Sequence, residues 1–472
     1  MQHNLFSPRT YTERRAQLKR AMGSGLLIFL GNGESPMNYE DNVYAFRQDS
    51  TMLYFFGSDY AGVNALIDVD NDREIIFADD LTIDDIVWTG VLPSVAECSS
   101  WAGITETHPA KDFFSYVANA QKQGQTVHFL PPYRAEHRLL LQELLGIPCA
   151  QQADEASVSL IQAIVEMRNH KTEEEIEQIE IAVDRSVDMH VAAMHATRPG
   201  ILESEVVAEV TKVALMGGQE MSFPLIATIN GQTLHNVDRS HTLQEGQMML
   251  VDAGAESPLH YAGDLSSIIP VGEHFTARQK LIFDVLYTAH RTATSALRPG
   301  INFRDVHLLT VAKICEGLKG LGMVKGDPEE LARTGAYAIF MPCGLGHMMG
   351  LDVHDMENLG EKYVGYAGKE KSTQFGFKSL RLARPLEAGY TFTIEPGIYF
   401  IPDLIDLWQS EGRYADLLNY EEINKWRDFT GMRNEENWLV TPTGARRLGH
   451  KVKPMTIEEI ERAKVTGKPA NA

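Results

Sequence analysis

The sequence predicts an α/β protein with two domains, and three observations support this fold class. The chain has 472 residues, more than one hydrophobic core usually supports. Helical and strand-like patterns alternate over residues 1–165. A helix start follows near residue 172, and a short internal repeat lies beyond it. We therefore expect an N-terminal α/β domain over residues 1–165 and a second domain over residues 172–472.

The first domain contains four apolar runs of strand length. They lie at residues 25–32, 64–70, 73–79 and 125–132. Helical patterns lie around residues 9–22 and 133–145. The sequence of this domain shows no cluster of charged residues that would suggest a catalytic centre.

The second domain opens with a predicted helix. Thr172 and Glu175 form a capping box, in which each side chain accepts a hydrogen bond from a free amide at the helix start. Apolar residues then recur at helical spacing, at Ile176, Ile179, Val183 and Val187. This stripe predicts a helix with one face in the core.

An internal repeat divides the second domain. TRPGILESEV at 197–206 recurs as LRPGINFRDV at 297–306. In each copy the Pro-Gly pair would end one helix and the next residues would begin another. Two similar halves of a helix pair plus strands would form a pseudo-twofold domain with a cleft between them. Coincidence also explains so short a repeat, because Pro-Gly is common between helices.

Charge and composition exclude several classes of partner. The formal charge is −21, from 43 basic and 64 acidic residues, which disfavours nucleic acid and anionic membranes. No apolar run approaches the length of a membrane span, and the first residues lack a secretory-signal pattern. The four cysteines are scattered without CxxC spacing, as in proteins of a reducing compartment. We expect a cytoplasmic protein.

Five polar residues of the C-terminal half have the chemistry of a two-metal site. They are Asp252 in VDAGAE, Asp264 in AGDLSS, His347 in GLGHMMGLDVHD, Glu395 in TIEPG and Glu435 in GMRNEENWLVT. Four carboxylates and one imidazole suit Mn²⁺, Co²⁺ or Fe²⁺ better than a structural zinc site, which prefers thiolates and imidazoles. Two such ions can hold a hydroxide and polarise a carbonyl, so the set predicts metal-assisted hydrolysis.

The local patterns indicate how these residues could meet. Asp252 ends the run MMLVD, and an extended run follows Asp264, so a hairpin would turn both aspartates to one cleft. Glu395 ends the strand pattern YTFTIE, and Pro396 would end its ladder. Arg433 and Glu435 are two residues apart and would share a strand face. Taken singly, Asp252 also fits a turn, and Arg433 with Glu435 a surface ion pair.

His347 and His354 lie in one segment rich in glycine and methionine. Glycine would let the backbone approach a ligand closely. A single histidine in such a segment would most often be a core residue, whereas two leave a functional pair and a pair of core residues equally open.

Together these segments resemble the pita-bread-fold metallopeptidases, and more narrowly the Xaa-Pro peptidases, aminopeptidase P and prolidase. FRQDSTMLYFFG at 46–57 resembles their N-terminal domain. LHN at 234–236, the segments around His347 and Glu435, and the run 379–400 resemble their catalytic domain. The resemblance implies an N-terminal α/β domain followed by a pseudo-twofold pita-bread catalytic domain. The long insertion between Tyr399 and Phe429 is more similar to prolidase.

The resemblance also implies roles for individual residues. Asp252 would bind one metal, His347 and Glu395 the other, and Asp264 and Glu435 would bridge them. His235 and His354 would hold the substrate and stabilise the tetrahedral intermediate, Arg381 would lie near the carboxyl side of the substrate, and Arg433 would support the ligands. Glu395 is the candidate proton shuttle to the leaving nitrogen. We expect two divalent ions, with Mn²⁺ as the principal ion and Co²⁺, Zn²⁺ or Fe²⁺ as alternatives.

The chain departs from the family pattern in three places. Cys343 stands where many relatives have histidine, and Asn434 replaces an apolar residue beside the bridging glutamate. The spacing from Asp252 to Asp264 is one residue longer than in typical aminopeptidases P. The thiol of Cys343 is either a defective copy of the histidine or a buried group to which the pocket has adapted.

The expected function is that of an Xaa-Pro aminopeptidase, acting on peptides with proline at the second position, in a homodimer or homotetramer. An Xaa-Pro dipeptidase is the alternative. A metal-free, creatinase-like hydrolase is a weaker rival, because such relatives lack the full ligand set. A non-enzymatic binding protein on the same fold is the last alternative, with Cys343 as its sign of decay.

Overall fold

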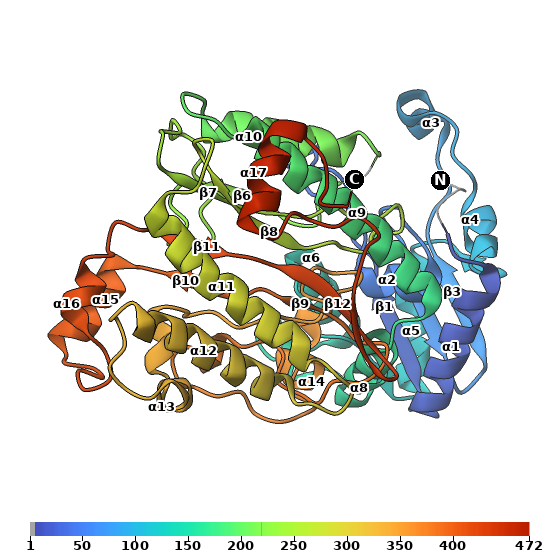
Figure 1. The fold of residues 1–472 in the computed structure, drawn as a ribbon. Helices are drawn as coiled ribbons and strands as arrows, with labels where there is room; N and C mark the ends of the chain where they lie inside the picture. Colours follow the sequence, from blue (N-terminus) through green and yellow to red (C-terminus); the bar gives the residue numbers. More distant parts are fainter. Residues whose placement is uncertain (1–4, 219, 472) are drawn as a thin grey trace. The chain divides into compact units, whose positions relative to one another are not determined.

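The structure is a computed structural model that describes residues 5–218 and 220–471. The chain forms two compact units. Unit 1 comprises Met1–Arg168 with Asn358–Gly360, and unit 2 comprises Asn169–Glu357 and Glu361–Ala472. Both contain helices and strands (Figure 1), so the predicted α/β class is confirmed.

Unit 1 is built on a mixed five-stranded sheet of order β4-β3-β2-β1-β5. Its strands are β1 Leu26–Leu30, β2 Asn64–Asp68, β3 Arg73–Phe77, β4 Glu106–His108 and β5 Val127–His128. The pairs β1/β2 and β2/β3 are antiparallel, whereas β1/β5 and β3/β4 are parallel. Each of the four predicted apolar runs contains one of these strands.

The helices of this part of the chain lie before, between and after these strands in the sequence. They are α1 Pro8–Met22, α2 Ser50–Phe56, α3 Ile83–Thr89, α4 Val95–Trp101, α5 Asp112–Lys122, α6 Ala135–Leu145, α7 Gln152–Glu155 and α8 Val158–Asn169. The predicted helices around 9–22 and 133–145 are α1 and α6. Ser7 caps α1 by accepting from the Thr10 amide.

Unit 2 opens with α9 Glu173–Ala196, the longest helix of the described residues. The predicted capping box is present: Thr172 Oγ1 accepts from the Glu175 amide, and Glu175 Oε2 accepts from the Thr172 amide. Ile179, Val183 and Val187 are buried, as the stripe predicted, whereas Ile176 at its start is only half-buried. Among the described residues, no helix combines the length and apolar character needed to cross a bilayer.

The internal repeat corresponds to two helix pairs. One copy joins α9 to α10 Glu203–Leu215, and the other joins α11 Ala277–Ala296 to α12 Phe303–Gly320. Gly200 and Gly300 have φ of 89° and 82°, a left-handed conformation that glycine adopts without strain. The reading of the repeat as two equivalent helix–helix turns is therefore confirmed.

Each helix pair is followed by strands that it covers. β6 Ile226–Thr228, β7 Met248–Ala253 and β8 Leu265–Pro270 form one antiparallel sheet, against which α9 packs. The strands β9 Thr391–Ile394, β12 Glu436–Thr441 and β13 Gly444–Arg447 form a second sheet, and β10 Gly397–Tyr399 pairs with β11 Gly431–Arg433. α11 packs against β9, β10 and β11, and β8 lies against β11 and β12. The two halves of unit 2 therefore meet along β8, β11 and β12.

The remaining helices connect these sheets or follow them. They are α13 Pro328–Thr334, α14 Glu361–Val364, α15 Pro402–Ser410, α16 Tyr420–Asn424, α17 Ile457–Thr466, and the 3₁₀ segments η1 Ala336–Ile339, η2 Glu357–Leu359 and η3 Phe377–Ser379. The insertion between Tyr399 and Phe429 forms α15 and α16. It is tied to α11 by Arg278, which donates to both carboxylate oxygens of Asp428.

Candidate metal centre

The predicted hairpin brings Asp252 and Asp264 together. β7 and β8 pair antiparallel, with Asp252 opposite Ser266, and Asp264 lies directly before β8. The Asp264 amide donates to Asn437 Oδ1 at 3.1 Å, which ties the start of β8 to β12. A Cβ on Gly254 would lie 1.8 Å from the Gly263 carbonyl oxygen, so glycine is required for this close approach of the two chain segments.

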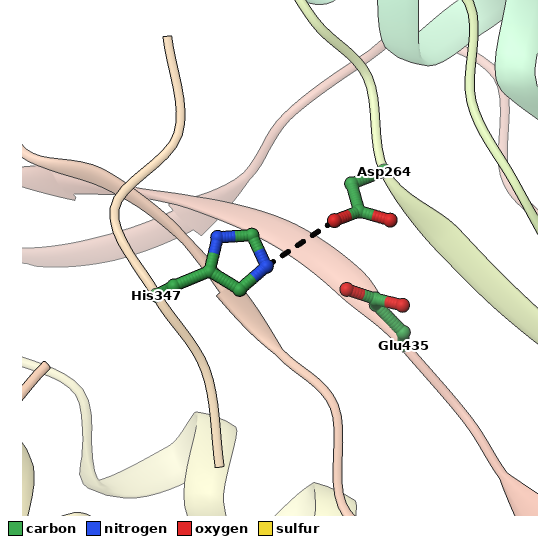
Figure 2. A group of neighbouring side chains, drawn as sticks. All are labelled: Asp264, His347 and Glu435. Atoms are coloured by element: carbon green, nitrogen blue, oxygen red, sulfur yellow. Dashed lines mark ion pairs between the residues drawn. The ribbon is translucent and has the colours of Figure 1, made fainter. Parts of the chain in front are cut away.

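His347 approaches the aspartates from the segment 344–355, which lies between η1 and η2 and runs alongside β9. Its Nδ1 lies 3.0 Å from the Met348 carbonyl oxygen, a contact that requires the proton on Nδ1. Nε2 therefore presents a lone pair, 3.3 Å from Asp264 Oδ2 and 3.4 Å from Glu395 Oε1. Figure 2 shows this nitrogen directed at Asp264, with Glu435 close by.

The glycines of this segment allow close contact with neighbouring backbone. A Cβ on Gly346 would lie 2.1 Å from the Thr393 carbonyl oxygen on β9, and one on Gly344 would lie 2.9 Å from the Ser379 carbonyl oxygen. Both glycines also line the cavity, where their approach to a ligand stays a prediction. The backbone of His347 is held further by Thr393 Oγ1, which accepts from the His347 amide at 3.1 Å.

Arg433 and Glu435 do not share one strand face, so that prediction is wrong. Arg433 ends β11, which pairs with β10, whereas Glu435 precedes β12, which pairs with β9. The chain changes strand partner between the two residues, and the alternation of a single strand does not apply. Ser266 nevertheless joins them: its Oγ donates to Glu435 Oε2 at 2.7 Å and accepts from Arg433 Nε at 2.9 Å.

Arg433 is the cation nearest to Asp252. Its Nη2 donates to Asp252 Oδ2 at 2.5 Å, and its Nη1 donates to Tyr399 Oη at 3.1 Å. Glu395 directly follows β9, as the strand pattern predicted, and its Oε1 accepts from Thr393 Oγ1 at 3.1 Å. The hydrogen bond to Asp252 holds the guanidinium of Arg433 at the edge of the buried cluster, and the one from Thr393 holds the carboxylate of Glu395 there.

The carboxylates of the cluster are buried and repel one another. Burial, with Asp252 and Glu395 nearby, raises the pKa of Asp264 well above its usual range. Burial, with Asp264, Glu395 and Asp252, does the same to the pKa of Glu435, and burial raises the pKa of Asp252 despite Arg433. Such a cluster is costly in the ionised form unless further positive charge compensates it.

A divalent cation fits this donor set. Ligand atoms of Asp264, His347 and Glu435 lie within 4.8 Å of one another. Asp252 Oδ1 and Glu435 Oε1 are buried and have no hydrogen-bond partner among the residues that the structure describes. The available donors are carboxylate oxygens and one imidazole nitrogen, which suit a hard or borderline ion. The ligand roles of the individual residues remain predictions.

The cluster lies on the wall of a cavity of about 630 Å³ within unit 2. All the predicted site residues line it, namely Asp252, Asp264, His347, Glu395, Glu435, His235, His354, Arg381, Arg433 and Cys343. Phe223, Pro224, Ile226 and Leu234 give it an apolar wall. Its size and its mixture of apolar wall and convergent polar groups are those of a small-ligand or peptide site.

Two predicted residues at the cavity have notable surroundings. His354 packs against His347 with ring centroids 4.1 Å apart, and its Nδ1 lies 2.6 Å from Glu357 Oε2.

Burial raises the pKa of the Cys343 thiol to about 12. The thiol therefore stays protonated near neutral pH and is not a nucleophile.

Sequence reasoning missed Ser266 and Glu357. Ser266 is two residues after Asp264, so strand alternation would have placed both on one face. Glu357 follows His354 by three residues and accepts from Arg381 Nη1 at 2.5 Å. A short-range pairing rule would have suggested the contact with His354, but not the one with Arg381.

Metal removal should change how stability depends on pH. Asp264 and Glu435 have folded-state pKa values above those of the unfolded chain, so without metal their contribution is favourable at low pH and is lost as pH rises through the raised values. A bound cation removes this loss, because it binds the deprotonated carboxylates. The rise in Tm on adding Mn²⁺ to chelator-treated protein should therefore grow from about pH 5 to about pH 8. Calorimetry across that range checks this, and a constant rise would contradict it.

Comparison with known proteins agrees with the geometry. The metallopeptidase family M24 matches residues 151–442, and the aminopeptidase P N-terminal domain matches residues 11–128. A human Xaa-Pro dipeptidase is 29% identical over 456 residues, covering 95% of this chain and 90% of the relative. A probable Xaa-Pro aminopeptidase of Uncinocarpus reesii is 27% identical, with 95% and 92% covered.

Solved structures show the same architecture. A variant of Escherichia coli aminopeptidase P in complex with substrate has a TM-score of 0.79 at 25% identity, with 98% of this chain and 99% of that chain covered. The aminopeptidase of Pseudomonas aeruginosa has the same TM-score at 24% identity. The predicted resemblance to aminopeptidase P and prolidase is thus confirmed over nearly the whole length. The chain belongs to metallopeptidase family M24.

Proposed function

We propose that the protein is a metal-dependent exopeptidase that hydrolyses the Xaa-Pro bond at the N-terminus of peptides. The observation that carries the proposal is the convergence of Asp264, His347 and Glu435 on a cavity of about 630 Å³, with two buried carboxylate oxygens left without partners among the described residues. Relatives named Xaa-Pro aminopeptidase and Xaa-Pro dipeptidase support the same chemistry. Two rivals, a metal-free hydrolase and a binding protein, do not account for this donor set.

The proposed cofactor is a pair of divalent ions, with Mn²⁺ preferred. Asp252 would hold one ion, His347 and Glu395 the other, and Asp264 and Glu435 would contact both. When bound, the ions polarise the scissile carbonyl and make a water molecule more acidic. The positive charge of Arg433 offsets the negative charge of Asp252. The remaining carboxylates therefore supply the negative charge that such ions need.

The protein groups then orient the substrate and move the proton. Thr393 Oγ1 donates to one oxygen of Glu395, whose carboxylate lines the cavity. There the carboxylate can take a proton and pass it to the leaving proline nitrogen. His354 donates from Nδ1 to Glu357, whose pKa this hydrogen bond and Arg381 lower to about 2. Burial and the adjacent His347 lower the pKa of His354. His354 would contact the substrate and the tetrahedral intermediate from the cavity wall.

Removing Glu435 tests the function and the metal proposal together. Glu435→Ala should abolish turnover of an Xaa-Pro-Yaa tripeptide by the Mn²⁺-loaded protein and should lower its metal content. Glu316→Ala, at an exposed glutamate paired with Lys313, is the matched control and should change neither. Turnover with elemental analysis by mass spectrometry gives both readouts. Two bound metals and normal turnover in Glu435→Ala would refute the assignment.

The surroundings of Arg381 favour peptides longer than a dipeptide. Arg381 Nη1 donates to Glu357 Oε1 at 2.5 Å and to Glu361 Oε1 at 2.7 Å, and Lys371 also donates to Glu361. A strict dipeptidase has to attract the free carboxylate of its substrate, most effectively with an uncompensated cation. Two glutamates already offset the charge of Arg381. The dipeptidase alternative rests on the human relative and on the insertion that forms α15 and α16.

Glu357→Gln should shift specificity toward free dipeptides. The amide oxygen of glutamine still accepts from His354, but one of the two negative charges that offset Arg381 is lost. The ratio of kcat/KM for an Xaa-Pro dipeptide to that for its C-terminal amide should rise about three- to tenfold. Glu370→Gln, at an exposed glutamate paired with Lys362, is the control. An unchanged ratio in Glu357→Gln would contradict the role of Glu357.

Self-association is also part of the proposal. α3 buries none of its residues, and Ile83, Trp88 and Val91 are 73%, 87% and 81% exposed in the isolated chain. Exposed apolar segments of this kind usually pack against another chain. We expect a homodimer or homotetramer by light scattering, and Trp88→Ser should shift it toward the monomer. An unchanged mass in that variant would exclude α3 as the interface.

The environment of the cysteines agrees with a cytoplasmic location. Cys98, Cys149, Cys315 and Cys343 are all free thiols. Free thiols of this kind persist in a reducing compartment.

The proposed substrate is a peptide with proline at the second position. The net charge of −21 disfavours nucleic acid as a partner.

A further inference from the structure

A buried lysine lies behind the carboxylate cluster. Lys453 is 1% exposed and lies between β13 and α17, beyond residue 442 where the family match ends. Its Nζ donates to the Ser266 carbonyl oxygen at 2.5 Å and to Asn434 Oδ1 at 2.7 Å, with Ser267 Oγ at 3.4 Å. Lys453 is not among the described residues that line the cavity.

The partners of Lys453 flank Glu435 on both sides. Asn434 precedes Glu435 in the chain, and Ser266 contacts it twice. The Ser266 hydroxyl donates to Glu435 Oε2 at 2.7 Å, and the Ser266 carbonyl oxygen accepts from the Glu435 amide at 3.3 Å. The ammonium of Lys453 thus holds the two residues that hold Glu435.

Asn434 supplies an acceptor that the buried ammonium needs. An apolar side chain at position 434 would leave the ammonium short of an acceptor. A buried charge is costly unless hydrogen bonds satisfy it, so lysine and asparagine depend on each other. Burial lowers the pKa of Lys453 to about 8, against the favourable charges of Glu436 and Glu435, so the ammonium is still largely charged near neutral pH.

We propose that the ammonium of Lys453, held by Asn434 and Ser266, weakens the binding of divalent metal by placing a fixed positive charge behind the carboxylate cluster. The inference rests on the proposed metal site. A purely structural pair would affect folding alone. A charged pair also sets the affinity for a cation, because like charges in a buried site repel strongly.

The test compares metal affinity in variants that remove the charge but keep the packing. Lys453→Met combined with Asn434→Leu replaces both partners with apolar groups and leaves the Ser266–Glu435 hydrogen bonds intact. Lys453→Gln keeps a donor to the same acceptors and serves if the double variant fails to fold. Equilibrium dialysis of chelator-treated protein against Mn²⁺ alone measures Kd. Both variants should bind Mn²⁺ about tenfold more tightly than the natural protein.

Lys464→Met is the matched control. Lys464 Nζ donates to the Thr197 carbonyl oxygen, and burial lowers its pKa to about 8 as it does for Lys453, but its contacts lie away from the carboxylates. Lys464→Met should lower Tm and leave the Kd for Mn²⁺ unchanged.

Two results would overturn the inference. An unchanged or weaker Kd in both charge-removing variants, with normal turnover in the natural protein, would refute the role of Lys453 and leave the proposed function intact. Failure of the natural protein to bind Mn²⁺ would refute the proposed function and the inference with it.

Discussion

The mutual repulsion of buried carboxylates is the constraint on which the rest of the site depends. Asp252, Asp264 and Glu435 are each at least nine-tenths buried, and burial and proximity raise the pKa of all three. A protein that keeps such a cluster has to compensate it with positive charge. Arg433 supplies part of that charge at Asp252, Lys453 adds a positive charge behind the cluster, and the proposed metal ions supply the remainder.

The scaffold holds the carboxylates close together through backbone contacts between its two halves. The Glu435 amide donates to the Ser266 carbonyl oxygen, and Asn437 holds the Asp264 amide, so β8 of one half is joined to the start of β12 of the other. Gly254 and Gly346 allow approaches that any side chain would block. The site is therefore built from paired strands and tight loops rather than from exposed loop tips.

Much of this arrangement could be predicted from local pattern. Asp252 and Glu395 end apolar runs, and the capping box and the Pro-Gly repeat mark the ends of α9 to α12, so these features needed no knowledge of distant contacts. The placement of Arg433 and Glu435 on one strand was wrong because the chain changes partner sheet between them. Lys453 and Ser266 were missed for a related reason: their roles follow from hydrogen bonds to residues 19 and 169 positions away.

The central claim is that two divalent ions compensate the buried carboxylates. Anomalous diffraction from crystals of the Mn²⁺-loaded protein tests it most directly. The account predicts two anomalous peaks per chain, both within coordination distance of Asp264 and Glu435, with Asp252 at one peak and His347 at the other. A single peak, or peaks away from these carboxylates, would contradict it.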